Sequence, residues 1–146
     1  MSGSASYVSR QGSKYTPGIS KESVGAQALF LGMVTIPPEG RTKAHIHALH
    51  ESAFYMMRGG EVELWTGGAL EHREVAHPGD YLFIPAGVPH VAVNRREVPA
   101  VFIGVRNEST AQESVVMHPE LDDRGAIRPA QKQCDRLAMK RWVILR

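Results

Sequence analysis

Two stretches of this chain read Gly40-Arg-Thr-Lys-Ala-His45-Ile-His47-Ala-Leu-His50-Glu51-Ser52 and Gly79-Asp-Tyr-Leu-Phe-Ile-Pro85-Ala-Gly87-Val-Pro-His90-Val-Ala-Val-Asn94. Two histidines separated by one residue on a β-strand point to the same side, about 7 Å apart along the chain. His90 opens a second strand after a proline-containing turn. Neutral imidazole is a common ligand of Zn, Fe, Ni and Cu, and an added carboxylate suits Fe or Mn. The two stretches therefore predict one metal site that takes His45 and His47 from one strand and His90 from another.

A further ligand from the first stretch is ambiguous between His50 and Glu51. Counted back from the hairpin glycine Gly59, the strand carries two alternating sets: Met56, Phe54, Ser52 and His50 on one face, and Met57, Tyr55, Ala53 and Glu51 on the other. If the first set faces the interior, His50 is the ligand. If a bulge near Gly59 shifts the register, Glu51 takes that place.

The residues around the histidines predict a cavity. Phe54 and Met56 lie on the strand after the first cluster, so we expect them to line a largely apolar space beside the metal. Arg41 and Lys43 alternate onto the face that carries His45. They either bind an anionic substrate at the cavity or lie beyond its mouth in solvent.

The rest of the chain supplies the setting of these stretches. Short apolar or alternating segments, separated by turns rich in Gly and Pro, predict strands over residues 23–36, 41–47, 52–57, 61–65, 71–75, 81–84, 90–94 and 100–105. No helical period runs through this region. Many short strands at regular spacing predict an all-β sandwich or barrel.

Both ends of the chain differ from this pattern. Residues 1–22 are rich in Ser and Gly and predict a flexible or extended arm, which leaves a barrel over residues 23–117. Residues 118–146 form a basic C-terminal extension, with seven Lys/Arg against one Asp from Arg124 onward. The extension predicts a helix from Pro129, or a final strand over its last Val-Ile-Leu.

Composition restricts the function classes. The 146 residues include 42% apolar and 22% charged residues, which is typical of a single globular domain, and the net charge is +2. We expect no nucleic-acid partner, because the barrel region is mildly acidic. A single cysteine excludes an intrachain disulfide and suits a reducing compartment. No signal peptide or membrane span is expected, so the predicted location is cytoplasmic.

The two stretches resemble the paired sequence motifs of the cupin superfamily. The second stretch fits the family spacing throughout, from Gly79 to Asn94. The first has four residues rather than five between Gly40 and His45, and seven rather than six between Glu51 and Gly59. The resemblance covers residues 25 to 106. It implies a double-stranded β-helix, the cupin jelly-roll barrel, with a short C-terminal extension.

The resemblance also implies functions, although this fold carries many reactions. The run from His45 to Tyr55 and the segment from Asn107 to Leu121 are similar to small single-domain bacterial cupins, some of them related to polyketide cyclases. Members that bind metal through four histidines favour His50 over Glu51. We therefore expect one Zn, Fe, Ni or Mn ion and an aromatic, polyketide-like or carbonyl substrate. The expected protein is a metal-dependent cyclase, isomerase or dioxygenase, with a non-catalytic binding module as the alternative, and family habit suggests a homodimer.

Overall fold

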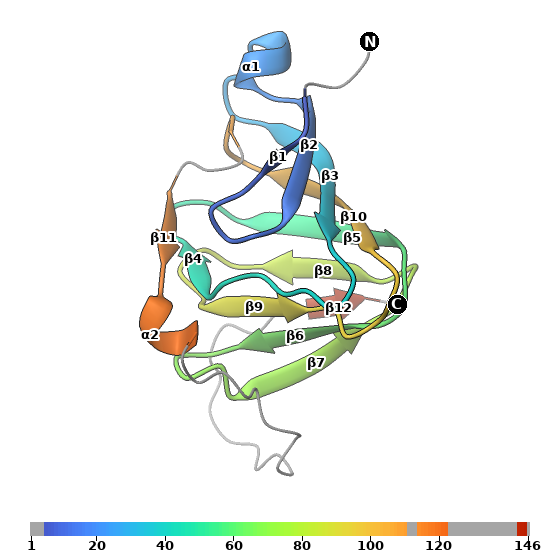
Figure 1. Cartoon of the computed structure of the whole chain (residues 1–146). Helices are drawn as coiled ribbons and strands as arrows, with labels where there is room; N and C mark the ends of the chain where they lie inside the picture. The colour runs from blue at the N-terminus through green and yellow to red at the C-terminus, as the bar shows by residue number, and fades with distance from the viewer. Residues whose placement is uncertain (1–4, 111–113, 123–142, 146) are drawn as a thin grey trace.

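Two antiparallel β-sheets face each other in the computed structural model, which describes residues 5–110, 114–122 and 143–145 (Figure 1). The larger sheet has seven strands in the order β1-β2-β3-β10-β5-β8-β12, and the smaller has five in the order β11-β4-β9-β6-β7. The predicted all-β fold is confirmed.

The strands of the larger sheet are β1 (Tyr7–Val8), β2 (Lys14–Ile19), β3 (Phe30–Ile36), β10 (Ala100–Arg106), β5 (Ser52–Arg58), β8 (Tyr81–Ile84) and β12 (Val143–Leu145). Those of the smaller sheet are β11 (Val115–Met117), β4 (His45–His47), β9 (His90–Val93), β6 (Val62–Thr66) and β7 (His72–Ala76). Two short helices, α1 (Lys21–Val24) and α2 (Pro119–Asp122), flank them.

The core forms between the sheets because alternate residues of each strand point inward. In β3 the buried positions are Phe30, Gly32, Val34 and Ile36. They pack with inward residues of the neighbouring strands, including Met56, Leu64, Leu82, Ile84 and Phe102. Burial of this apolar set is the main favourable contribution to the stability of the barrel.

The strand predicted over residues 23–36 is shorter in the structure. Ser20 caps α1, with its side chain accepting a hydrogen bond from the backbone N–H of Ser23. Gly25 ends the helix in the left-handed region, at φ 71°. This helical turn takes up the first residues of the predicted strand, so β3 begins only at Phe30, and its outer face is partly exposed rather than buried.

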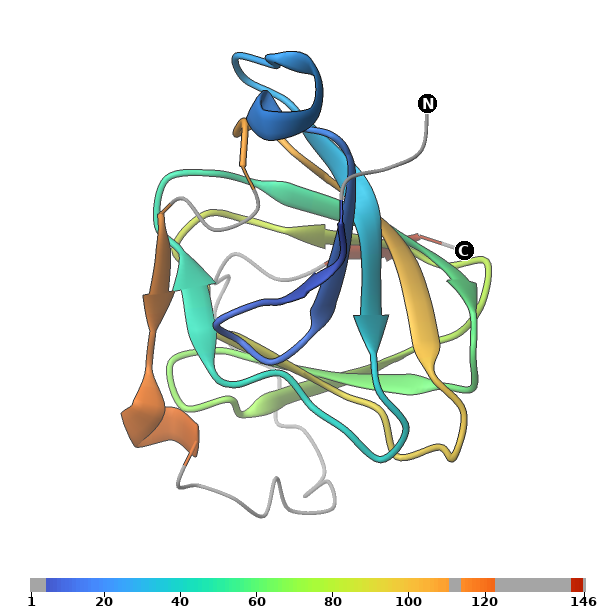
Figure 2. The same ribbon diagram turned by 45° about the horizontal axis from the view of Figure 1, so that its top comes forward.

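From residue 5 onward, the N-terminal arm joins the larger sheet through β1 and β2. β1 pairs with β2, and β2 pairs with β3, so the segment forms a hairpin rather than a disordered end. Its loop crosses one end of the barrel and reaches the residues before β4, where the backbone N–H of Lys43 donates to the carbonyl of Gln11 at 2.7 Å (Figure 2). Alternate residues of the hairpin are buried: Ser9, Gln11, Ser13 and Tyr15. Because three of these four are polar, the apolar pattern that marks a strand is missing from the sequence.

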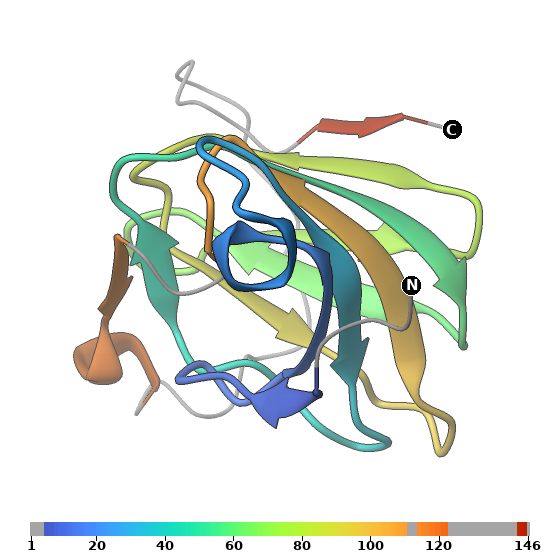
Figure 3. The same ribbon diagram turned by 90° about the horizontal axis from the view of Figure 1, so that it is seen from above.

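The C-terminal extension is described only in part. β12 pairs with β8, at the outer edge of the larger sheet, which confirms the alternative of a final strand (Figure 3). The helix predicted from Pro129 lies outside the described residues. None of the described helices is long and apolar enough to cross a membrane.

Candidate metal centre

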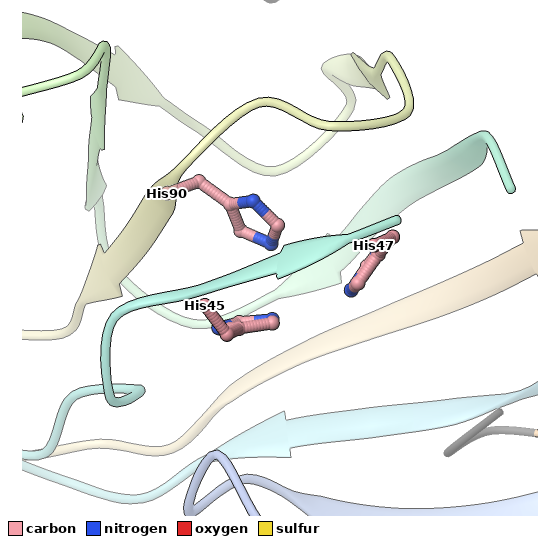
Figure 4. Close-up of side chains that lie close together, drawn as sticks. All are labelled: His45, His47 and His90. Atoms are coloured by element: carbon pink, nitrogen blue, oxygen red, sulfur yellow. The ribbon is translucent and has the colours of Figure 1, made fainter. Parts of the chain in front are cut away.

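Three histidines converge inside the barrel, as predicted. His45 and His47 stand on the same side of β4, and His90, the first residue of β9, is the register partner of His45. All three are buried, with 3%, 1% and 3% of their surface exposed. One ring nitrogen from each lies within 4.8 Å of the other two. Figure 4 shows the three rings directed toward a common point. This arrangement offers three ligand atoms to one ion.

The main chain sets the tautomer of two of these rings. The Nδ1 atom of His45 lies 2.7 Å from the carbonyl oxygen of Lys43, and that of His90 lies 2.8 Å from the carbonyl oxygen of Val88. A carbonyl oxygen only accepts hydrogen bonds, so each Nδ1 must carry the proton. The Nε2 atom of each ring then carries the lone pair that a metal ligand needs. Second-sphere bonds of this kind orient metal-binding histidines in general.

His47 is held by a side chain instead. Its Nδ1 lies 2.9 Å from the hydroxyl of Ser52, which also accepts a hydrogen bond from Nε of Arg106 at 3.3 Å. Its Nε2 is buried and has no hydrogen-bond partner among the described residues. A buried ring nitrogen without a partner is costly. A metal ion at the three-histidine centre would supply that partner, because the Nε2 lone pair would then be coordinated.

The structure separates His50 from Glu51. His50 is buried and Glu51 is exposed, because the face of β5 that carries Ser52 and Met56 points inward. A register shift does occur on β5, but it falls between Met56 and Arg58 and leaves the earlier residues in phase.

His50 lies next to the three-histidine group without being one of its members. Its Nδ1 contacts the Ser114 hydroxyl at 2.8 Å and the carboxylate of Glu108. Its ring stacks on His47, with ring centroids 4.4 Å apart. Its Nε2 is buried and has no hydrogen-bond partner among the described residues. The stacking on His47 and this unpartnered nitrogen make His50 a candidate for a fourth ligand.

Burial keeps these imidazoles neutral. Desolvation lowers the pKa of His45 and of His50 to about 4, and it lowers the pKa of His47 and of His90 as well. The positive charge of the buried Arg106 lowers the pKa of all four further. A metal ligand must be the neutral imidazole, so the site is ready to bind a cation at neutral pH without releasing protons.

A cavity adjoins the three histidines, with about 470 Å³ of empty space including its open mouth. Most of its wall is apolar: Val34, Ile36, Phe54, Leu64, Leu82, Ile84, Ala92 and Phe102. Its polar lining, apart from the histidines, is Gln11, Ser13, Tyr15 and Thr42. Three of these four come from the N-terminal hairpin, which sequence reasoning did not connect with the site.

The predicted lining is correct for Phe54 only. Met56 packs in the core between the sheets and is not part of the cavity wall. Arg41 is bound to Asp122 at 2.5 Å, and Lys43 is exposed. Of the two alternatives for these residues, the structure agrees with the one outside the cavity, because β4 and its alternation begin only at His45.

Comparison with known proteins agrees with this architecture. Residues 32–106 match a family model described as the cupin domain. No curated protein matches the chain. Among solved structures, an uncharacterized conserved protein with a double-stranded β-helix domain from Klebsiella pneumoniae is similar at 16% identity and TM-score 0.59, over 75% of this chain and 86% of the other.

Two oxalate decarboxylase structures are also similar. That from Lactobacillus farciminis, a formate complex, shares 20% identity at TM-score 0.64, over 86% of this chain and 36% of the other. That from Bacillus subtilis, described for its Mn(II) centres, shares 18% identity at TM-score 0.61, over 84% of this chain and 31% of the other. The chain therefore spans about a third of the length of these enzymes. At such identities the likeness shows the fold alone.

Proposed function

This chain belongs to the cupin family, and on that premise we propose that it binds one divalent transition-metal ion through His45, His47 and His90. We also propose that His50 completes the set, and that a small organic molecule binds in the adjoining cavity. One observation carries the proposal: two backbone carbonyls fix the proton of His45 and of His90 on Nδ1, which puts the lone pair on Nε2, and one ring nitrogen of each lies within 4.8 Å of one from His47. Metal-binding histidines almost always donate their other ring N–H to a carbonyl, a carboxylate or water in this way.

The donor set narrows the choice of metal. Four neutral imidazoles suit Zn, Ni or Fe better than Mn, which favours carboxylate oxygens. The Mn(II) described for Bacillus subtilis oxalate decarboxylase belongs to that enzyme. When bound, such an ion supplies Lewis-acid chemistry at an oxygen of the substrate, or open positions for water or dioxygen.

The protein's own residues then select and hold the substrate. The apolar wall excludes water and favours an aromatic, polyketide-like or carbonyl compound. The reactions that fit are cyclisation, isomerisation and dioxygenation.

The site is tested by metal content. We expect the double variant His45→Ala/His90→Ala to lose its metal when measured by ICP-MS. The matched control is His72→Ala, on the edge strand β7 and outside the site, which should retain it. Unchanged metal stoichiometry in the double variant, together with an intact β-sheet CD spectrum, would refute the proposal.

A second candidate, a non-catalytic binding module, is supported by the composition of the cavity wall. Among the described residues, no Asp, Glu, Lys or Cys lines it, so an acid–base group other than the histidines and Tyr15 is absent there. A binding module predicts ligand affinity without turnover across panels of carbonyl, phenolic and sugar compounds. Turnover of any of these by the metal-loaded protein would exclude it.

The outer face of the larger sheet supports a homodimer. Two cross-strand rows of mostly apolar residues cover it: Met33, Ile103, Tyr55 and Tyr81, then Leu31, Val105, Ala53 and Phe83. Met33, Tyr55 and Tyr81 are 40%, 38% and 56% exposed. Exposed apolar patches of this kind commonly mark interfaces. We expect light scattering to give a dimer for the wild type and a monomer for Tyr55→Arg. A monomeric wild type would refute this.

A further inference from the structure

The N-terminal hairpin brings a buried tyrosine to the cavity. Tyr15, on β2, lines the cavity together with the three histidines and is 3% exposed. Its phenol oxygen contacts a terminal NH₂ group of Arg106, on β10. Arg106 is the largest fully buried side chain of the described residues, at 2% exposure. The cavity wall thus contains a phenol hydroxyl that is bound to a buried cation behind it.

The direction of this hydrogen bond determines what Tyr15 can still do. A guanidinium group only donates, so the Tyr15 oxygen must be the acceptor. Within the described part of the chain, Arg106 is the one hydrogen-bond partner of that oxygen. The phenol O–H therefore keeps its proton for another acceptor. Bonding to a cation also makes the O–H a stronger donor, because the guanidinium withdraws electron density from the oxygen.

The ring of Tyr15 is fixed on several sides. It stacks on Tyr7, with centroids 5.9 Å apart, and packs at a tilt against Phe30 at 6.2 Å. The Cζ atom of Arg106 lies 5.0 Å from its centroid, over the ring. The same guanidinium donates through Nε to Ser52, the partner of His47. Arg106 therefore connects the donor in the cavity wall with one of the proposed metal ligands.

The charge of the site indicates which acceptor fits. The proposed ligands are neutral imidazoles, so a divalent ion held by them would keep its full charge. Among the described residues no carboxylate lines the cavity. Excess positive charge in an apolar space strongly favours a ligand of opposite charge.

We propose that Tyr15 is a substrate-binding residue that donates its phenol O–H to an anionic oxygen, a carboxylate or enolate, of the ligand in this cavity. Arg106 acts as its positioning residue. The substrate class is then a small organic anion rather than a neutral molecule. This inference rests on the proposed metal site.

The test uses the full chain loaded with Zn²⁺ and two pairs of probes, acetate with acetamide and benzoate with benzamide. Calorimetry should give at least tenfold tighter binding of each carboxylate than of its amide. Tyr15→Phe should weaken carboxylate binding about tenfold, or about 1.4 kcal/mol, as expected for a hydrogen bond to a charged group. The matched control Tyr7→Phe loses a hydroxyl on the same hairpin and should bind carboxylates as the wild type does. Zinc stoichiometry should not change in either variant.

A measurement on the wild type covers the case in which Tyr15→Phe does not fold. The chain has four tyrosines. With ¹³Cζ-labelled tyrosine, acetate should shift the resonance of Tyr15, which is assigned by elimination from Tyr7→Phe, Tyr55→Phe and Tyr81→Phe. Equal affinity for acids and amides, wild-type affinity in Tyr15→Phe, or an unmoved Tyr15 resonance would each overturn the inference. A wild type that takes up no zinc would refute the proposed function, and the inference with it.

Discussion

The four buried histidines fall into two pairs that are anchored by different means. The Nδ1 atoms of His45 and His90 bond backbone carbonyls, each two residues earlier in the chain. Those of His47 and His50 bond side chains, the hydroxyl of Ser52 and the Ser114–Glu108 pair. The first anchor is a property of the strand itself and cannot be lost by substitution of another side chain. The second depends on particular residues and can be altered one atom at a time.

The largest effect should come from the ligands themselves. His90→Ala removes a carbonyl-anchored ring, and we expect metal to fall below detection by ICP-MS. His50→Ala removes the ring outside the three-histidine group, so metal should still bind, with lower affinity. Competition with a chromogenic zinc chelator would measure the difference. An equal loss of zinc affinity in His90→Ala and His50→Ala would show that the two pairs of histidines contribute equally to metal binding. The way in which each ring is anchored would then not affect the affinity.

Removing an anchor should have a smaller effect than removing a ligand. Ser52→Ala leaves Nδ1 of His47 without its partner and Nε of Arg106 without one acceptor. We expect zinc affinity to fall about 10- to 100-fold, as for other second-sphere partners of metal ligands. The matched control is Ser9→Ala, which removes a buried hydroxyl whose side-chain partner is Ser13 rather than a histidine. Equal zinc affinity in the two variants would mean that the hydroxyl does not orient His47.

Lowering the pH should weaken the folded state of the metal-free protein. The pKa of His45 and of His50 is lowered to about 4, against 6.5 for an ordinary histidine. Between these values the unfolded chain binds more protons, so stability is highest above pH 6.5 and falls as the pH drops toward 4. Each such group contributes up to about 1.4 kcal/mol per pH unit. Urea unfolding at several pH values, with chelator present, would measure this slope.

A variant shows whether this slope belongs to the buried rings. His50→Gln removes one side-chain-anchored ring and should flatten the decline between pH 6.5 and 4. His72→Gln, on the edge strand β7, should leave the decline unchanged. A pH-independent stability of the metal-free wild type would contradict the neutral state assigned to these histidines.

The difference between the two pairs also shows what the sequence alone could predict. The barrel and the inward direction of His45, His47 and His90 follow from alternation along strands and from local spacing, both of which a sequence displays directly. Alternation along the strand could not decide between His50 and Glu51. Which of the two faces inward depends on the position of the bulge in β5, and the pairing of β5 with β10 determines that position.

The polar part of the cavity could not be predicted for a similar reason. Tyr15 meets Arg106 across 91 positions of sequence, and neither residue carries a motif. The hairpin that brings Tyr15 to the cavity buries Ser9, Gln11 and Ser13, so it lacks the apolar alternation by which strands are recognised. Contacts of this kind arise from tertiary pairing, and only the folded chain reveals them.

The smallest effect should come from a contact beside the carbonyl-anchored pair. Asp122 accepts hydrogen bonds from Arg41 and from the backbone N–H of Ala44, next to His45. Both side chains of the ion pair are partly exposed, so Asp122→Ala should cost only about 1 kcal/mol of stability. Zinc affinity should stay within about twofold of the wild type, because the carbonyl of Lys43 still fixes His45. The control is Glu120→Ala, which removes an exposed carboxylate from the same helix. A large loss of zinc affinity in Asp122→Ala alone would show that α2 positions His45, and that main-chain anchoring by itself does not make a ligand independent of its neighbours.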